Sequence, residues 1–137
     1  MTESNPYFVK ICGLTTLGDA NAAIDAGASA IGLILASSPR QLTLDRALAI
    51  AAGTKGRALR VLVFRDNDDE SIVQSLELID ADFVQLHGPL SDDLLRQLRT
   101  RQVRVIKALS IGSEEFFELK PVALRASTEG PSPVAKT

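Results

Sequence analysis

The feature that most constrains this chain is a series of five short apolar segments, separated by stretches with helical periodicity. The segments cover residues 7–12, 30–35, 60–64, 82–87 and 103–109. The second segment reads Ala-Ile-Gly-Leu-Ile-Leu and shows no alternation, which is typical of a strand covered on both faces. Strands that alternate with helices in this way predict a parallel sheet with right-handed crossovers.

The intervening stretches carry helix-start signals. A hydroxyl side chain stands at the expected capping position before three of the four predicted helices, and an acidic run at 66–70 precedes the remaining one. These predicted caps are Thr16, Thr43 and Ser91. On the second helix, the spacing predicts a buried face made of Leu44, Ala47, Leu48 and Ala51.

Two architectures fit this order of elements: an open doubly wound sheet, or part of an eight-stranded (β/α) barrel. A short fifth helix is expected at 114–119. Residues 121–137 contain three prolines and no sustained apolar period, so we expect a mostly disordered tail there. The predicted organisation is therefore one domain over 1–119, followed by a disordered or divergent tail over 120–137.

Charge and cysteine content limit the classes of partner. The chain has 15 basic and 17 acidic residues, so its net charge of −2 gives no electrostatic reason to expect nucleic acid or an anionic membrane as a partner. Its single cysteine excludes an internal disulfide and fits a reducing compartment. Residues 1–6 are polar and no apolar run is long enough to span a bilayer, so we expect a cytoplasmic protein.

Cys12 is the first candidate for chemistry, because it ends the first predicted strand and Gly13 allows a sharp turn after it. The carboxyl ends of parallel strands form the edge at which ligands bind in such folds. A thiol at that edge can act as a base or a nucleophile. The alternative interpretation is a small buried apolar residue, which is the more common role of a lone cysteine.

Three further residues are candidates for binding. Arg40 follows Pro39 in a stiffened loop, where a guanidinium suits a carboxylate or a phosphate; the alternative is an exposed arginine without a role. Gln85 and His87 share one face of the fourth strand, and Gln85 interrupts an apolar run, which requires a buried hydrogen bond. His87 has no second His or Cys at ligand spacing, so we predict no metal site; it is alternatively a histidine satisfied by backbone groups.

Several of these stretches, taken together, resemble phosphoribosylanthranilate isomerase, a barrel enzyme of tryptophan biosynthesis. The resemblance rests on Lys-Ile-Cys-Gly at 10–13, Ser-Pro-Arg at 38–40 and Gln-Leu-His-Gly at 85–88, which follow one another at plausible spacing. It covers about residues 7–111. The implied fold is α/β, a partial (β/α)8 TIM barrel of about four and a half βα units.

The resemblance implies an Amadori rearrangement of N-(5-phosphoribosyl)anthranilate that needs no cofactor or metal. It assigns Cys12 as the general base, Arg40 as the residue that holds the anthranilate carboxylate, and Gln85 and His87 as residues that line the pocket. The partner implied is thus a small phosphorylated sugar-anthranilate substrate.

In the family, the general acid is an aspartate on a strand beyond the fifth, and glycine-rich loops that bind the phosphate follow later strands. In this sequence the resemblance ends at Ile111, and no motif that matches these groups is found after it. Arg65 also stands where the family more often has a small or apolar residue. We therefore expect little isomerase activity from this chain alone. The alternatives are a non-catalytic barrel fragment that associates with itself or with a complementary fragment through exposed sheet edges, and a flavodoxin-like binding domain.

Overall fold

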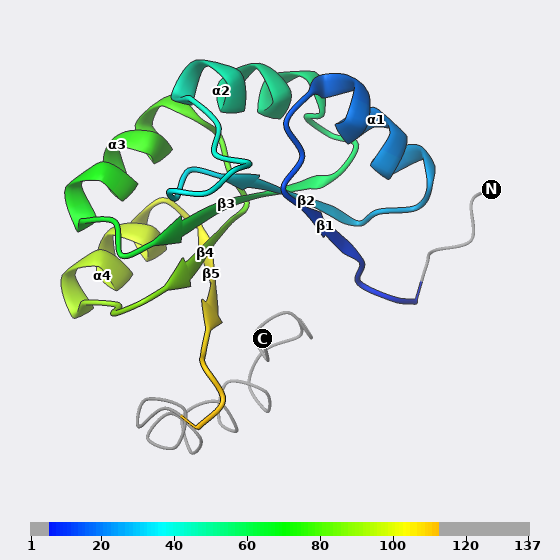
Figure 1. The fold of residues 1–137 in the computed structure, drawn as a ribbon. Helices are drawn as coiled ribbons and strands as arrows, with labels where there is room; N and C mark the ends of the chain where they lie inside the picture. Colours follow the sequence, from blue (N-terminus) through cyan, green and yellow to red (C-terminus); the bar gives the residue numbers. More distant parts are fainter. Residues whose placement is uncertain (1–5, 113–137) are drawn as a thin grey trace.

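The computed structural model describes residues 6–112, which form one five-stranded parallel sheet with four helices (Figure 1). The expected helix at 114–119 and the expected tail at 121–137 lie outside the described residues. The elements in chain order are β1 (Lys10–Cys12), α1 (Leu17–Asp25), β2 (Ala30–Ile34), α2 (Leu44–Gly53), β3 (Leu59–Arg65), α3 (Asp69–Leu78), β4 (Phe83–His87), α4 (Asp92–Thr100) and β5 (Arg104–Ala108).

The strand order distinguishes the two architectures that the sequence left open. Each strand pairs in parallel with the next one in the chain, giving the order β1-β2-β3-β4-β5. A doubly wound or flavodoxin-like sheet reverses its strand order and carries helices on both faces. Here all four helices follow the convex face of a curved sheet (Figure 1). The described residues therefore form part of a (β/α) barrel, and the doubly wound alternatives are wrong.

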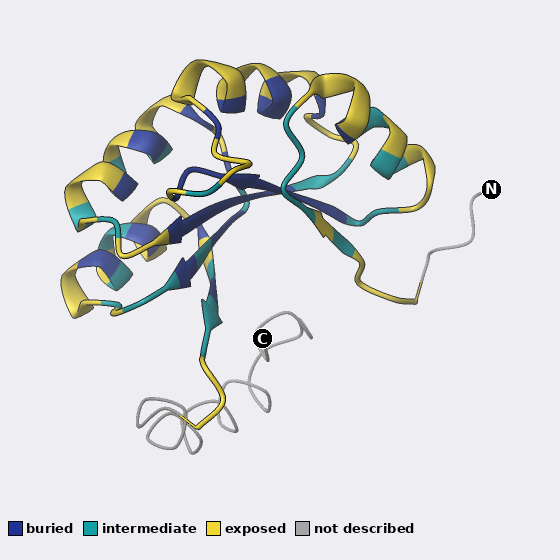
Figure 2. Ribbon diagram, viewed as in Figure 1, coloured by how far each residue is buried: buried dark blue, intermediate teal, exposed yellow. Residues whose placement is uncertain are grey.

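The two faces of the sheet contribute to two separate apolar clusters. Between sheet and helices lies the larger cluster, which includes Ile31, Leu33, Leu62, Phe64 and Leu86. The opposite, concave face carries a smaller cluster. Figure 2 shows the buried strands at the centre of the sheet and the exposed outer faces of the helices. The members of the concave cluster are Ala30, Ile34, Ala36, Val61, Val63, Phe83 and Ile106, with Cys12 and Leu59 packed against it.

The three hydroxyl caps predicted from the sequence are confirmed. The side chains of Thr16, Thr43 and Ser91 each accept a hydrogen bond from a backbone N–H three residues on. Asp68 caps α3 in the same way, and the Ser71 N–H and hydroxyl hold the pKa of its carboxyl below the usual value. These caps satisfy helix-end donors that would otherwise lack a partner.

The predicted buried face of α2 is partly wrong. Ala47 and Ala51 are buried as expected, but Leu44 and Leu48 are 39% and 40% exposed, and Ile50 is buried instead. The helix is rotated so that small side chains and one isoleucine face the sheet. At the end of the helix, Gly53 lies against Leu17 of α1.

The first strand is shorter than the apolar segment that predicted it. Because β1 is at the edge of the sheet, it pairs with β2 only, over Lys10–Cys12. Its outward-lying Ile11 is 40% exposed, although its register partner on β2, Ile31, is fully buried. Among the described helices, none has the length and apolar character needed to cross a membrane.

Candidate active site

The residues proposed for chemistry lie at the carboxyl ends of the strands and in the loops that follow. Cys12 is the last residue of β1, His87 is the last of β4, and Arg40 belongs to the loop between β2 and α2. Because all five strands are parallel, these positions share one rim of the sheet. This rim is where ligands bind in (β/α) barrels.

Cys12 is placed by a close approach to the neighbouring strand. Its register partner is Gly32 of β2, and a Cβ built on Gly32 would lie 2.7 Å from the Cys12 Sγ and 3.1 Å from its Cα. Any larger residue at position 32 would displace the thiol. The missing side chain of Gly32 thus leaves the space that the thiol occupies, on the concave side of the sheet.

The Arg40 side chain lies at the same part of the rim, against Gly13. A Cβ built on Gly13 would lie 2.6 Å from the Arg40 Cζ, so the guanidinium packs on the backbone directly after Cys12. Gly13 also has φ +79°, a left-handed conformation that glycine adopts without strain. The Arg40 loop is held by the Arg40 N–H, which donates to the Ser38 Oγ at 3.0 Å. Cys12 and Arg40, 28 positions apart in the sequence, are therefore neighbours in space.

Gln85 and His87 form a second pair, on β4. The Gln85 Nε2 lies 3.2 Å from the His87 Nε2. The Gln85 amide nitrogen is a donor only, so the His87 Nε2 accepts this hydrogen bond when the ring carries its proton on Nδ1. Burial lowers the pKa of His87, and the positive charges of Arg65, Lys107 and Lys10 lower it further, against the opposing effect of Asp66.

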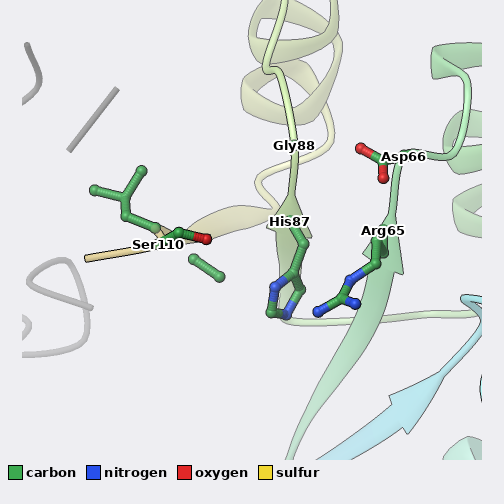
Figure 3. A pocket seen from close by; sticks show the side chains of 7 residues that line it. Arg65, Asp66, His87, Gly88 and Ser110 are labelled. Atoms are coloured by element: carbon green, nitrogen blue, oxygen red, sulfur yellow. The ribbon is translucent and has the colours of Figure 1, made fainter. Parts of the chain in front are cut away.

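A cavity of about 370 Å³ opens beside this pair (Figure 3). It lies at the ends of β3, β4 and β5, and its lining combines charged side chains with apolar ones. Cys12, Arg40 and Gln85 do not line it; His87 is the predicted site residue that does. The lining residues are Arg65, Asp66, His87, Gly88, Ala108, Leu109 and Ser110.

Arg65 and Asp66 were not predicted as site residues. Arg65 follows the apolar run of the third strand, at the same parity as Val61 and Val63, and that parity was the signal that it faces the site. Its register partner is His87. Asp66 has φ +53°, and its N–H donates to the His87 carbonyl at 3.0 Å, so the turn after β3 is tied to the end of β4.

The described residues offer no obvious place for a metal ion. Within residues 6–112, no group of three or more His, Cys, Asp or Glu side chains is arranged to hold one. The chemical groups that this rim does gather are a thiol, an imidazole and guanidinium groups, which suit proton transfer and the binding of anions.

Comparison with known proteins identifies the family. The family model described as N-(5'-phosphoribosyl)anthranilate isomerase matches residues 9–127, which extends past Ile111, where the motifs read from the sequence end. The chain belongs to the phosphoribosylanthranilate isomerase family. The family resemblance inferred from the three motifs is therefore confirmed, and with it the partial TIM barrel.

Curated relatives carry the same name. The N-(5'-phosphoribosyl)anthranilate isomerase of Rubrobacter xylanophilus is 38% identical over 119 residues, covering 84% of this chain and 58% of the relative. That of Brucella canis is 41% identical over 117 residues, covering 84% of this chain and 52% of the relative. The chain thus spans about half the length of the curated relatives it matches.

Solved structures of phosphoribosylanthranilate isomerases have the same fold. One from Thermus thermophilus superposes with a TM-score of 0.69 at 35% identity, covering 78% of this chain and 54% of that one. Another, in complex with reduced 1-(o-carboxyphenylamino)-1-deoxyribulose 5-phosphate, gives a TM-score of 0.73 at 30% identity, covering 88% and 61%. A structure of monomers generated from the dimeric phosphoribosylanthranilate isomerase of Thermotoga maritima gives a TM-score of 0.73 at 29% identity, covering 88% of this chain and 61% of that one.

Proposed function

We propose that this chain supplies the base-bearing and carboxylate-binding half of a phosphoribosylanthranilate isomerase site, in the cytoplasm. The observation that carries the proposal is the meeting of Cys12 and Arg40 at Gly13. A substrate whose carboxylate pairs with the Arg40 guanidinium is held beside the Cys12 thiol. The bound ligand named for the solved relative carries a carboxyl group of the kind that Arg40 would hold, together with a phosphate.

In the proposed reaction, Cys12 acts on the ring-opened Schiff base of the substrate. Its sulfur, deprotonated as the thiolate, takes the proton from ribose C2. The C–H electron pair forms the C1=C2 bond of the enolamine as the C=N π electrons move to nitrogen, and the enolamine then tautomerises to the ketose. Arg40 holds the anthranilate carboxylate so that C2 faces the sulfur. His87 lines the pocket, and Gln85 supports the His87 ring from 3.2 Å away. The family resemblance places the general acid on a strand beyond the fifth, outside the described residues, so the chain alone is expected to turn over slowly.

Reconstitution tests this proposal. The chain is mixed with a segment carrying strands six to eight of the Rubrobacter xylanophilus relative, and isomerase turnover is measured. We expect turnover on mixing, a loss of about 100-fold or more with Cys12→Ser, and a raised KM with Arg40→Gln. Arg96→Gln, on the outer surface of α4, is the matched control and leaves turnover unchanged. Full turnover by Cys12→Ser would contradict the role of the thiol.

A second candidate function is a non-catalytic half-barrel that associates with a second copy or a complementary fragment. The observation that favours it is the open sheet, whose edge strands β1 and β5 each pair on one side only among the described residues. Unpaired parallel edges favour association with another chain. Sedimentation at increasing concentration distinguishes the two cases: this function requires a concentration-dependent oligomer, and a monomer at every concentration would exclude self-association.

A further inference from the structure

The cavity at the ends of β3, β4 and β5 contains a cationic group that the proposed reaction does not use. Arg65 ends β3, and its register partner His87 ends β4, so both side chains project from the same face of the sheet. Figure 3 shows the Arg65 guanidinium directed toward the His87 ring. The walls beside them are the apolar side chains of Ala108 and Leu109.

The Arg65 guanidinium has no carboxylate within ion-pairing distance among residues 6–112. Some other arginines of the described chain do have a carboxylate partner: Arg57 pairs with Asp25 and Arg60 with Asp82.

Asp66 lines the same cavity, but its carboxylate packs against Gly88. A Cβ built on Gly88 would lie 2.6 Å from the Asp66 Oδ1, and Figure 3 shows the carboxylate directed away from the Arg65 guanidinium. Among residues 6–112, the Arg65 guanidinium is therefore left to face the cavity without a counter-charge.

The cavity is separate from the place where Arg40 lies. The Arg40 guanidinium packs on Gly13, at the end of β1, whereas Arg65 ends β3. Neighbouring strands lie about 4.8 Å apart, so the ends of β1 and β3 are about 10 Å from one another. That separation of the two strand ends suits a ligand with two anionic groups, one for each guanidinium.

We propose that the cavity at the ends of β3, β4 and β5 is a second oxyanion site, in which the Arg65 guanidinium binds a carboxylate or a phosphate. The guanidinium supplies paired N–H donors that match either group. The His87 ring, which lies 3.2 Å from the Gln85 Nε2, forms one wall of the site. The site requires neither Cys12 nor turnover, so it can be tested apart from the isomerase proposal.

His87 gives a direct readout, because it is the single histidine of the chain. The charged groups that act on it are Arg65 from β3, Lys107 from β5, Lys10 from β1 and the opposing Asp66. An oxyanion bound to Arg65 stabilises the protonated ring and therefore raises the pKa of His87. An NMR pH titration of the full chain measures this pKa in inorganic phosphate, in benzoate and in chloride at equal ionic strength.

We expect a higher pKa for His87 in phosphate or in benzoate than in chloride. The anion that raises the pKa shows whether the site binds a phosphate or a carboxylate. Arg65→Gln, at an exposed position, is expected to weaken binding of that anion about tenfold, as for the loss of a charge-assisted hydrogen bond. Arg96→Gln removes the same charge from α4 and leaves binding unchanged.

The proposal is overturned if neither anion changes the pKa of His87, or if Arg65→Gln binds as tightly as the parent chain. A two-dimensional NMR spectrum of Arg65→Gln checks that the variant is folded. The isomerase proposal is independent of this result. An inactive reconstituted barrel with intact oxyanion binding would reject only the isomerase proposal. An active barrel without oxyanion binding would reject only the oxyanion site.

Discussion

Arginines at the two ends of the strands differ in whether a carboxylate pairs with them. At the amino end, the Arg60 side chain is nearly fully buried, lies 3.5 Å from the Asp82 Oδ2 and 3.7 Å from the Asp80 Oδ2, and donates to the Ala51 carbonyl. At the carboxyl end, Arg40 and Arg65 have no carboxylate partner within residues 6–112. One end therefore uses its charge to hold elements together, and the other leaves its charge available to a ligand, as barrels commonly do.

Replacing one arginine at each end tests this difference. The variant at the amino end is expected to cause the largest loss in the free energy of unfolding. Arg60→Met leaves Asp82 without its buried partner and should lower the free energy of unfolding by about 2 to 3 kcal/mol. Arg65→Met, at an exposed position, should change it by less than about 0.5 kcal/mol. Urea denaturation of both variants measures this, and equal losses would remove the distinction between the two ends.

Gly32→Ala tests how tightly the carboxyl end is built around the thiol. The new methyl group overlaps the Cys12 Sγ, so we expect a loss of about 1 to 2 kcal/mol in the free energy of unfolding. The same change in a Cys12→Ala background should cost less, because the sulfur is gone.

Gly18→Ala is the matched control for that variant. The nearest atom outside the helix backbone is the Thr16 Oγ1, 3.9 Å from the built Cβ, so the substitution should stabilise helix α1 by about 0.5 to 1 kcal/mol. A Gly32→Ala chain as stable as the parent would show that the thiol does not occupy the space above Gly32.

The smallest expected effect is on the pH dependence of the free energy of unfolding, and it concerns His87 at the carboxyl end. The pKa of His87 is lowered in the folded chain, so the unfolded chain binds more protons below its ordinary pKa of about 6.5. Stability is therefore expected to fall as the pH decreases through this range. Denaturation at pH 7.5 and 5.5 should show a smaller fall for His87→Gln than for the parent, and an equal fall would indicate that His87 titrates normally.

The sequence was sufficient to predict the strands and three of the helix caps, because these follow from local periodicity and from residues such as Thr43 and Ser91. The barrel segment was predicted from the family resemblance, since periodicity left two architectures open. The sequence could not predict which face of α2 is buried, because both leucines and alanines fit a helical stripe and tertiary packing decides between them. It also could not place Arg65 opposite His87, because register between strands depends on tertiary pairing.

The candidate site was predicted in part. Cys12 and Arg40 were assigned to one rim by topology and resemblance, and the described structure brings them together through Gly13. What the sequence did not indicate was how they meet, because the roles of Gly13 and Gly32 depend on clearances between side chains from different strands.

The most direct test of the account is the alkylation of Cys12, the single cysteine, by anionic iodoacetate and by neutral iodoacetamide. A guanidinium beside the thiol attracts the anionic reagent, so the ratio of the two rates should fall several-fold in Arg40→Gln, a loss of about 1 kcal/mol of attraction. Arg96→Gln should leave the ratio unchanged. If the ratio is the same in Arg40→Gln as in the parent chain, Arg40 does not act at the thiol and the proposed site is wrong.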